Sequence, residues 1–420
     1  MDRRKPTSAL DAAQRRRGYV HFDMPLSKKA CKALVEDPDA VASHSFFPFL
    51  RQDIVRNRIK RVGPGLLEKT KKVRDIRYAA HADAAIYTYY NYLLSEKYEA
   101  LVNAAGASDA VIAFRSLAKS NVDLANESFQ WIAAHTPCTA LGFDVQDFFG
   151  SLDHQLLKKQ WADLLLVPNL PPDHFVVYRS LTRHASVELI AARHALKLSR
   201  EGLRRAQRLC SPLEFRQVVR EQGLIVVNQV SKGIPQGSPM SALLSNIYML
   251  PFDQCLLRET VARKGLYRRY CDDILVVVAP EHATEMQEIV AAELLKLKLK
   301  MQTKKTLVCN FTPKADKALQ YLGLVYDGVN IFLRSSGIAR YYARMRHGIG
   351  QHKSSNRRDG STPILQQRRK HLIRQYTEHA PKDHRNYFSY VRSAAQKTGS
   401  KAIRRQLRRH KKRFKSLIQE

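Results

Sequence analysis

Two apolar runs that flank a pair of acidic residues constrain the fold of this chain more than any other feature. Leu266-Tyr267 precedes Tyr270-Cys271-Asp272-Asp273 by two residues, and the run Ile274-Leu-Val-Val-Val follows it directly. Short runs of β-branched and aromatic residues on either side of a polar pair are typical of two strands joined by a tight turn. We therefore predict an antiparallel hairpin over residues 266–278 with the two acids at its tip. Adjacent acids at a hairpin tip most often belong to a solvated turn, so the pattern alone does not define a site.

A second segment places an acidic residue at the end of a short apolar run. Residues 139–143 are apolar, Asp144 follows them, and Phe148-Phe149 come shortly afterwards. Because a buried strand end rarely tolerates an unpaired charge, this pattern indicates either a functional carboxylate or one that caps a helix. Asp147, three residues further on, is interpreted as a solvated or capping residue.

The two segments together predict a site for divalent metal ions. Two such ions about 3.5–4 Å apart need roughly three carboxylates that converge from separate elements. Asp144, Asp272 and Asp273 supply that set. Mg²⁺ prefers oxygen ligands, and Mn²⁺ is expected as a substitute. Such a pair of ions activates an attacking 3′-hydroxyl and neutralises the charge on a transferred phosphoryl group and on the departing pyrophosphate.

A third segment, residues 233–246, contains two glycines and two prolines and then becomes helical in pattern. Ser238 is predicted as the residue that caps this helix, with Pro239 at the first helical position. Gly237 lets the backbone approach a substrate closely, and Gln236 can hold a template-paired nucleotide by hydrogen bonds.

The composition indicates a polyanionic partner. Lys and Arg number 71 against 38 Asp and Glu, which gives a formal net charge of +33. With 420 residues and 44% hydrophobic residues, the chain can bury a sizeable core without disulfides. Its six cysteines are scattered, with no Cys-x-x-Cys pair, and no apolar run approaches the roughly 18 residues of a membrane span. We expect a cytoplasmic protein with no membrane partner.

The chain divides by pattern into four stretches. Residues 1–65 are mixed in character and end in a Gly63-Pro64-Gly65 turn, and residues 66–139 are mainly helical in pattern. Strands and helices alternate over residues 140–333, where a basic helical insertion occupies about 177–228. Residues 334–420 contain about 24 basic and four acidic residues, with apolar positions at helical spacing.

Together and in this order, the three motif segments resemble the palm motifs of reverse transcriptases. Asp144 with Phe148-Phe149 matches the first catalytic motif, and Tyr270-Cys-Asp-Asp matches the aspartate-pair box. Residues 233–246 match the Pro-Gln-Gly motif. Two short segments after the palm hairpin are similar to further motifs: Lys304-Lys305-Thr306 resembles the lysine motif, and Tyr321-Leu322-Gly323-Leu324 resembles the primer grip. Upstream, Lys71 to Ile76 is similar to the fingers segment that holds the incoming triphosphate.

The resemblance implies a role for each matching residue. The metal set is Asp144, Val145, Asp272 and Asp273, and Lys305 joins the three acids as a catalytic residue near the pyrophosphate, where it is a candidate proton donor. Phe149 is implied as a steric gate, because its ring would crowd the 2′-hydroxyl of a ribonucleotide. The substrate-binding set is Lys72, Arg74, Val145, Phe148, Phe149, Gln236 and Gly237.

The fold that the resemblance implies is an α+β right-hand polymerase. Its parts are an N-terminal extension or start of the fingers (1–65), helical fingers (66–139), a palm of antiparallel sheet plus helices (140–333), and a basic all-helical thumb or RNA-binding tail (334–420). The expected partners are an RNA template, a cDNA product and dNTPs. We expect no RNase H domain, because no segment is left over to form one.

The branch of the family follows from smaller features. Retron enzymes usually carry a Val-Thr-Gly tripeptide beyond the palm, and this chain has none. Intron-encoded enzymes often add a nuclease domain that contains cysteines, and no cysteine follows Arg334. The Tyr270-Cys-Asp-Asp box, residues 81–87 and the basic helical end look most like bacterial defence-associated reverse transcriptases of unknown group, which copy a structured non-coding RNA and act against phage. A template-independent DNA polymerase, a group II intron or retron-type enzyme, and a non-catalytic RNA-binding scaffold remain alternatives. Priming, the identity of the template and the oligomeric state are not specified by the sequence.

Overall fold

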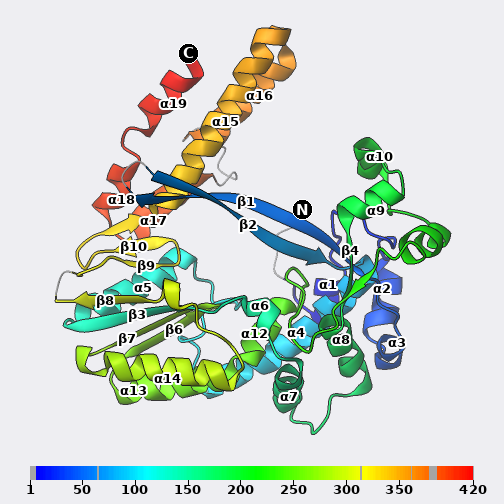
Figure 1. Cartoon of the computed structure of the whole chain (residues 1–420), viewed down its shortest axis with the longest axis horizontal. Coiled ribbons are helices and arrows are strands. Elements are labelled where there is room, and N and C mark those ends of the chain that lie inside the picture. The colour runs from blue at the N-terminus through cyan, green and yellow to red at the C-terminus, as the bar shows by residue number, and fades with distance from the viewer. Residues whose placement is uncertain (1–5, 64–65, 313–314, 361, 378–385, 420) are drawn as a thin grey trace. The chain divides into compact units, whose positions relative to one another are not determined.

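A computed structural model describes residues 6–63, 66–312, 315–360, 362–377 and 386–419 (Figure 1). The chain forms two compact units, each built from three separate stretches. The first unit consists of Met1–Phe114, Val145–Leu256 and Val290–Gln302, and the second consists of Arg115–Asp144, Leu257–Ile289 and Thr303–Glu420. Two of the boundaries between the units lie within helices, α13 (Leu250–Ala262) and α14 (Ala283–Lys296).

The first unit contains a sheet dominated by one long hairpin, visible as the extended two-stranded ribbon in Figure 1. Strands β1 (Phe49–Gly63) and β2 (Leu66–Tyr78) pair antiparallel along nearly their whole length. Short strands β4 (Ala185–Glu188) and β5 (Val226–Val227) extend the sheet in the order β2-β1-β4-β5. The predicted turn at Gly63-Pro64-Gly65 includes residues 64–65, which lie outside the described residues; Gly63 pairs with Leu66 on either side of them.

The prediction of helix from residue 66 onward is wrong for residues 66–78, which form β2. Its Lys, Leu and Glu residues favour a helix only weakly, and tertiary pairing routinely overrides such propensities. Here β2 pairs with β1 from Leu66 to Tyr78, so cross-strand contacts decide the outcome.

Helix α4 (His81–Ala104) lies at the centre of the first unit. Asp23 accepts hydrogen bonds from the backbone N–H groups of His81 and Ala82, both at 2.9 Å, and so caps its first turn. The side chains of Ile86, Tyr87 and Tyr90 on this helix are buried in the core. The other helices of this unit are α1 (Ala9–Ala13), α2 (Lys28–Val35), α3 (Pro38–Ala42), α6 (Phe148–Ser151), α7 (His154–Leu165), α8 (Pro172–Thr182), α9 (Leu189–Ala195), α10 (Arg200–Arg205), α11 (Pro212–Glu214), the π-helix η1 (Phe215–Arg220) and α12 (Ser241–Tyr248).

The second unit contains a four-stranded antiparallel sheet in the order β6-β7-β3-β8. Its strands are β3 (Cys138–Asp144), β6 (Leu266–Tyr270), β7 (Asp273–Val278) and β8 (Leu307–Phe311). The two inner strands are almost entirely apolar and buried, as strands covered on both faces are. The predicted strand at 139–143 and the predicted hairpin at 266–278 are both confirmed.

The rest of the second unit consists of a small sheet and helices. Strands β9 (Leu319–Tyr321), β10 (Leu324–Tyr326) and β11 (Ile331–Leu333) form the sheet. The helical character predicted for residues 334–420 is confirmed by α15 (Ser335–Asp359), α16 (Pro363–Tyr376), α17 (Tyr387–Lys397), α18 (Lys401–Gln406) and α19 (His410–Gln419). The remaining helices of this unit are α5 (Asn121–Ala134) and the short turns η2 (Pro280–His282) and η3 (Thr303–Lys305).

A core of aromatic and aliphatic side chains joins α15, α16 and α19. Tyr341, Met345 and Ile349 of α15 pack there against Leu372 and Phe414. The basic side chains of these helices therefore lie mainly on their outer surfaces. Across the residues that can be described, we find no helix with the length and apolar character to cross a membrane.

Candidate active site

The centre of the site is a pair of carboxylates on adjacent strands. Asp144 is the last residue of β3, Asp273 is the first of β7, and the register of the two strands places them directly opposite one another. Directly opposed residues of antiparallel strands have Cα atoms about 4.5–5.5 Å apart. The two acids predicted from distant stretches of the sequence are thus neighbours.

The third acid lies in the two-residue loop between β6 and β7. Tyr270 pairs with Asp273, and Cys271 and Asp272 form the loop between them. Cys271 has a φ of +60°, a backbone conformation that favours glycine. The buried Arg269 donates a guanidinium hydrogen bond of 3.1 Å to the Cys271 carbonyl, and this bond stabilises the loop. Sequence reasoning missed Arg269; its only signal was a charge within an apolar strand.

Lys305 lies beside Asp144. It ends η3, which contacts β3, and its ammonium group forms an ion pair with the Asp144 carboxylate. Half of the Lys305 side chain remains exposed. The structure therefore brings together the four residues predicted as catalytic: Asp144, Asp272, Asp273 and Lys305.

The negative charges in this group oppose one another. Loss of water around Asp273 raises the pKa of its carboxyl to about 6, and the nearby Asp272 and Asp144 add to the shift. Lys305 and Arg334 act in the opposite direction. Asp273 nevertheless keeps exposed surface, so an ion from solvent can reach it. A divalent cation would relieve the repulsion among these carboxylates.

The donors match Mg²⁺ in chemical type, since all three are carboxylate oxygens. Among the described side chains, no three acids, histidines or cysteines form a ready metal site. Asp144 is paired with Lys305 instead, and its binding to a metal would require release of that lysine.

The turn between β9 and β10, which the sequence resemblance identifies with the primer grip, lies within electrostatic range of the acids. The Tyr321 hydroxyl is buried without a hydrogen-bond partner. Burial raises the pKa of this phenol, and the charge of Asp273 is the next contribution, so the ring lies within electrostatic range of the acids. Gly323 accepts a 3.1 Å hydrogen bond from the backbone N–H of Arg334.

The residues predicted to bind the nucleotide lie in the first unit. Gly237 has a φ of +119°, and a Cβ atom there would lie 2.6 Å from the carbonyl oxygen of Arg77. The N–H of Arg77 donates a 2.9 Å hydrogen bond to the carbonyl of Gln236. The close approach for which Gly237 is required is therefore made by the end of β2, and it fixes the Gln236 loop to that strand.

The predicted helix cap at Ser238, with Pro239 as the first helical residue, is wrong. Helix α12 begins at Ser241, and its N-cap residue Met240 has no side-chain cap. Residues 236–240 form turns instead, in which the Ser238 hydroxyl accepts a 3.3 Å hydrogen bond from the Met240 N–H. The helix starts later because this turn uses the cap residue locally.

The segment after Asp144 packs against the same loop. Val145 and Phe148 are buried, whereas Phe149 is partly exposed. The Phe149 carbonyl accepts a 2.9 Å hydrogen bond from the Ile234 N–H. Asp147 is exposed and makes no side-chain cap, which confirms its interpretation as a solvated residue.

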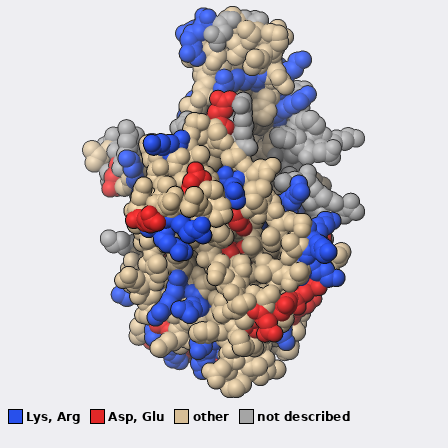
Figure 2. Space-filling model, turned by 90° about the vertical axis from the view of Figure 1, so that its right-hand side faces the viewer, with Lys and Arg blue, Asp and Glu red and all other residues tan. Residues whose placement is uncertain are grey.

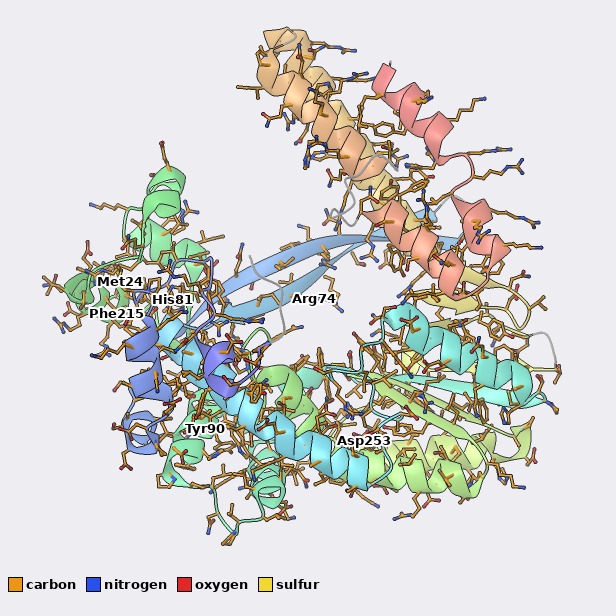
Figure 3. All side chains as sticks on the ribbon, turned by 180° about the vertical axis from the view of Figure 1, so that it is seen from behind. Met24, Arg74, His81, Tyr90, Phe215 and Asp253 are labelled. Carbon is orange, nitrogen blue, oxygen red and sulfur yellow. The ribbon has the colours of Figure 1, made fainter. Side chains whose placement is uncertain are left out.

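Lys72 and Arg74 lie two residues apart on β2 and therefore on one face of the hairpin. Figure 3 shows Arg74 on this hairpin. Lys72 is directly opposite Arg56, so two cations face each other across the strands. Like charges in that arrangement are destabilising, and a bound anion would offset the repulsion.

A sheet whose adjacent strands present paired carboxylates, with a lysine beside them, is an arrangement that two-metal nucleotidyl transfer can use. The chain matches the family model described as reverse transcriptase (RNA-dependent DNA polymerase) over residues 107–326, just over half of its length. It belongs to the reverse transcriptase family. Lys72 and Arg74 precede the matched region.

Several solved structures are similar to the chain at low sequence identity. Apo telomerase from Candida tropicalis is 12% identical with a TM-score of 0.44, over 86% of this chain and 63% of the telomerase. A form lacking its C-terminal domain is 11% identical with a TM-score of 0.44, over 66% and 54%. Candida albicans telomerase with a fragment of telomeric RNA is 10% identical with a TM-score of 0.42, over 93% and 68%. The chain thus spans between about half and two thirds of these proteins. No curated protein sequence matches it significantly.

Proposed function

We propose that this chain is an RNA-directed DNA polymerase that extends a primer by copying an RNA template into cDNA. The observation that carries the proposal is the placement of Asp144 directly opposite Asp273, next to Asp272 at the hairpin tip. Membership of the reverse transcriptase family supports it.

In this proposal Asp144, Val145, Asp272 and Asp273 would hold two Mg²⁺ ions, for which Mn²⁺ could substitute. The ions supply activation of the primer 3′-hydroxyl and neutralisation of phosphoryl charge. Lys305 releases Asp144 when the acids bind metal, and its ammonium group then serves as a proton donor near the leaving pyrophosphate.

The first unit supplies the nucleotide contacts. Phe149, which is partly exposed while its neighbour Phe148 is buried, acts as the gate against a 2′-hydroxyl. Gln236 and Gly237 lie beside the nucleotide, on a loop that the Arg77 backbone holds in place. Lys72 and Arg74 bind its phosphates, and the cationic pair formed by Lys72 and Arg56 supports an anionic ligand on this face.

We assign the remaining parts of the chain to the subdomains of a right-hand polymerase. Residues 66–139 act as fingers, 140–333 as palm and 334–420 as a thumb that holds RNA. Figure 2 shows basic side chains spread over one face of the molecule, with fewer acidic ones between them. The excess of basic residues supports binding to nucleic acid.

We further propose that the template is a structured non-coding RNA, that the enzyme works in the cytoplasm and that it acts in antiphage defence. Support for this branch comes from the sequence resemblance of the Tyr270-Cys-Asp-Asp box, of residues 81–87 and of the basic helical end. Sequencing the RNA and DNA that copurify with the protein from its host tests this branch directly.

Primer extension tests the enzymatic proposal. Purified protein with Mg²⁺, dNTPs and a DNA primer on an RNA template should give full-length cDNA, and no product without template. Asp272→Ala with Asp273→Ala should lower the rate below about one thousandth, because the metal ligands are lost. Binding to the same RNA should change little, since the basic surface is elsewhere.

Glu288→Gln is the matched control, because Glu288 is an exposed acid on α14 outside the site. It should extend primers at the wild-type rate. Normal polymerisation by the double alanine variant would refute the site, and product formed without template would identify a template-independent enzyme.

A further inference from the structure

The helical end of the second unit contains a hollow that the polymerase site does not use. Its volume is about 540 Å³, and it is lined by Tyr342 of α15 and by residues around the corner between α18 and α19. The complete lining is Tyr342, Arg405, Gln406, Arg408 and Arg409. Pockets of roughly 300–1,000 Å³ accommodate small organic ligands, so the hollow is larger than a lone ion needs.

The floor of the hollow is held in place by hydrogen bonds. The Gln406 amide accepts a 2.8 Å hydrogen bond from the Leu333 N–H and donates one of 3.1 Å to the Leu333 carbonyl. Ser400 caps α18 through the Ile403 N–H and donates a 2.6 Å hydrogen bond to the Ile331 carbonyl. The corner is therefore fastened to β11 at two points.

The aromatic wall of the hollow is also fixed. The Arg413 guanidinium lies over the Tyr342 ring at 4.6 Å, and the His410 ring lies 5.6 Å away. His410 is fully buried. These contacts restrict Tyr342 to one orientation.

The rim of the hollow is cationic. Arg405, Arg408 and Arg409 are exposed, and none of their guanidinium groups has a hydrogen bond or ion pair within the part of the chain that the structure describes. Three like charges around one hollow repel each other, and the sequence from 334 to 420 offers few acids to offset them. An anionic ligand is the simplest partner for such a rim.

We propose that this hollow binds phosphate groups of a single RNA strand at a site separate from the catalytic acids. The guanidinium fork pairs with phosphate oxygens in a bidentate way and stays charged at any physiological pH. A strand offers one phosphate per nucleotide, enough for three arginines, and a base of the same strand can pack on the Tyr342 wall. The choice of RNA as the strand rests on the proposed function.

Metal-free binding separates this site from catalysis. The probe is a labelled single-stranded oligoribonucleotide, measured by fluorescence anisotropy in EDTA against the full chain. The test variant is Arg405→Gln with Arg408→Gln and Arg409→Gln. The matched control removes three exposed arginines that lie outside residues 334–420, Arg179→Gln with Arg216→Gln and Arg220→Gln, for the same change in net charge.

The test variant should weaken binding by about tenfold or more, because charge-assisted contacts are lost. Its slope of log K against log salt should fall by roughly 2, as three phosphate contacts to a single strand predict. The control should stay within about twofold of wild type. Arg408→Gln alone should show a smaller loss in the same direction, which keeps the test valid if the triple variant misfolds.

Competition identifies the source of the phosphate. Unlabelled oligoribonucleotide should displace the probe from wild type, whereas pyrophosphate or dNTP at equal phosphate concentration should not. Equal losses of RNA affinity in the test and control variants, or no loss in either, would contradict RNA binding at this hollow. Displacement by pyrophosphate, with RNA binding unchanged in the test variant, would overturn the assignment to RNA. None of these results alters primer extension by the catalytic acids, so failure here and failure of the proposed function are distinguishable.

Discussion

At the scale of single residues, the site depends on which residues stand at the ends of strands and which side chains are exposed. Asp144 and Asp273 are opposite each other because one ends β3 and the other begins β7. Among Val145, Phe148 and Phe149, only Phe149 has exposed surface, because Val145 and Phe148 are buried. Its side chain is therefore the one of the three that can contact a bound nucleotide without rearrangement of the core.

Replacing Phe149 by Ala should raise the use of ribonucleotides. Loss of the ring removes the clash with a 2′-hydroxyl, so the ratio of kcat/KM for dNTP to that for rNTP should fall by at least about tenfold. Phe175→Ala is the control, since Phe175 is an exposed phenylalanine on α8. An unchanged ratio in the Phe149 variant would remove its role as a gate.

The sequence was sufficient to identify residues whose chemistry is unusual for their setting. A charge at the end of an apolar run gave Asp144 and the acid pair. It was not sufficient for residues that matter through tertiary contacts. The sequence placed Tyr321 in a segment similar to the primer grip, but only the fold shows that its unpartnered hydroxyl is buried and that its ring is within electrostatic range of Asp273. Gly237 was recognised as special, but the reason, contact with the Arg77 carbonyl, requires the β2 strand.

At the scale of elements, the β6-β7 hairpin and β3 form an electrostatic unit. Loss of water around Asp273, together with Asp272 and Asp144, raises the pKa of this carboxyl from its usual 3.8 to about 6. Between these values the folded state binds more protons than the unfolded state, so this group costs stability as pH rises from about 4 through 6. A bound divalent cation reverses the cost, because it favours the ionised carboxylate.

Mg²⁺ should therefore stabilise the protein more at pH 7.5 than at pH 5. The measurement is the shift in Tm on adding Mg²⁺ at each pH, with Ca²⁺-free buffers of constant ionic strength. Asp272→Asn with Asp273→Asn should abolish the difference between the two pH values. Equal shifts at both pH values in wild-type protein would contradict this account of the acids.

Elements were predictable where one local pattern dominated. The apolar strands of the palm and the basic helices after Arg334 follow from such patterns. Residues 66–78 were misassigned because their Lys and Leu content suits a helix, whereas pairing with β1 makes them a strand. Long-range pairing of this kind is not encoded in any short window of sequence.

At the scale of the whole molecule, the net charge of +33 predicts a polyanionic partner but not where it binds. The structure places acids and arginines in different regions. The sheet of β6, β7, β3 and β8 gathers the three acids, and the corner between α18 and α19 gathers arginines around a hollow. The hollow could not be predicted from sequence, because it requires Tyr342 to meet arginines that lie far along the chain.

The account depends on carboxylates from distant stretches that bind metal together. Binding of Mn²⁺, measured by loss of the free-ion EPR signal, tests this most directly in wild type, Asp144→Asn, Asp273→Asn and the double variant. Each single variant should weaken Mn²⁺ binding by at least about tenfold, and the double variant should lose less than the sum of the two free-energy changes because the residues share one ion. Unchanged Mn²⁺ binding in Asp144→Asn, or fully additive losses, would contradict a shared metal site.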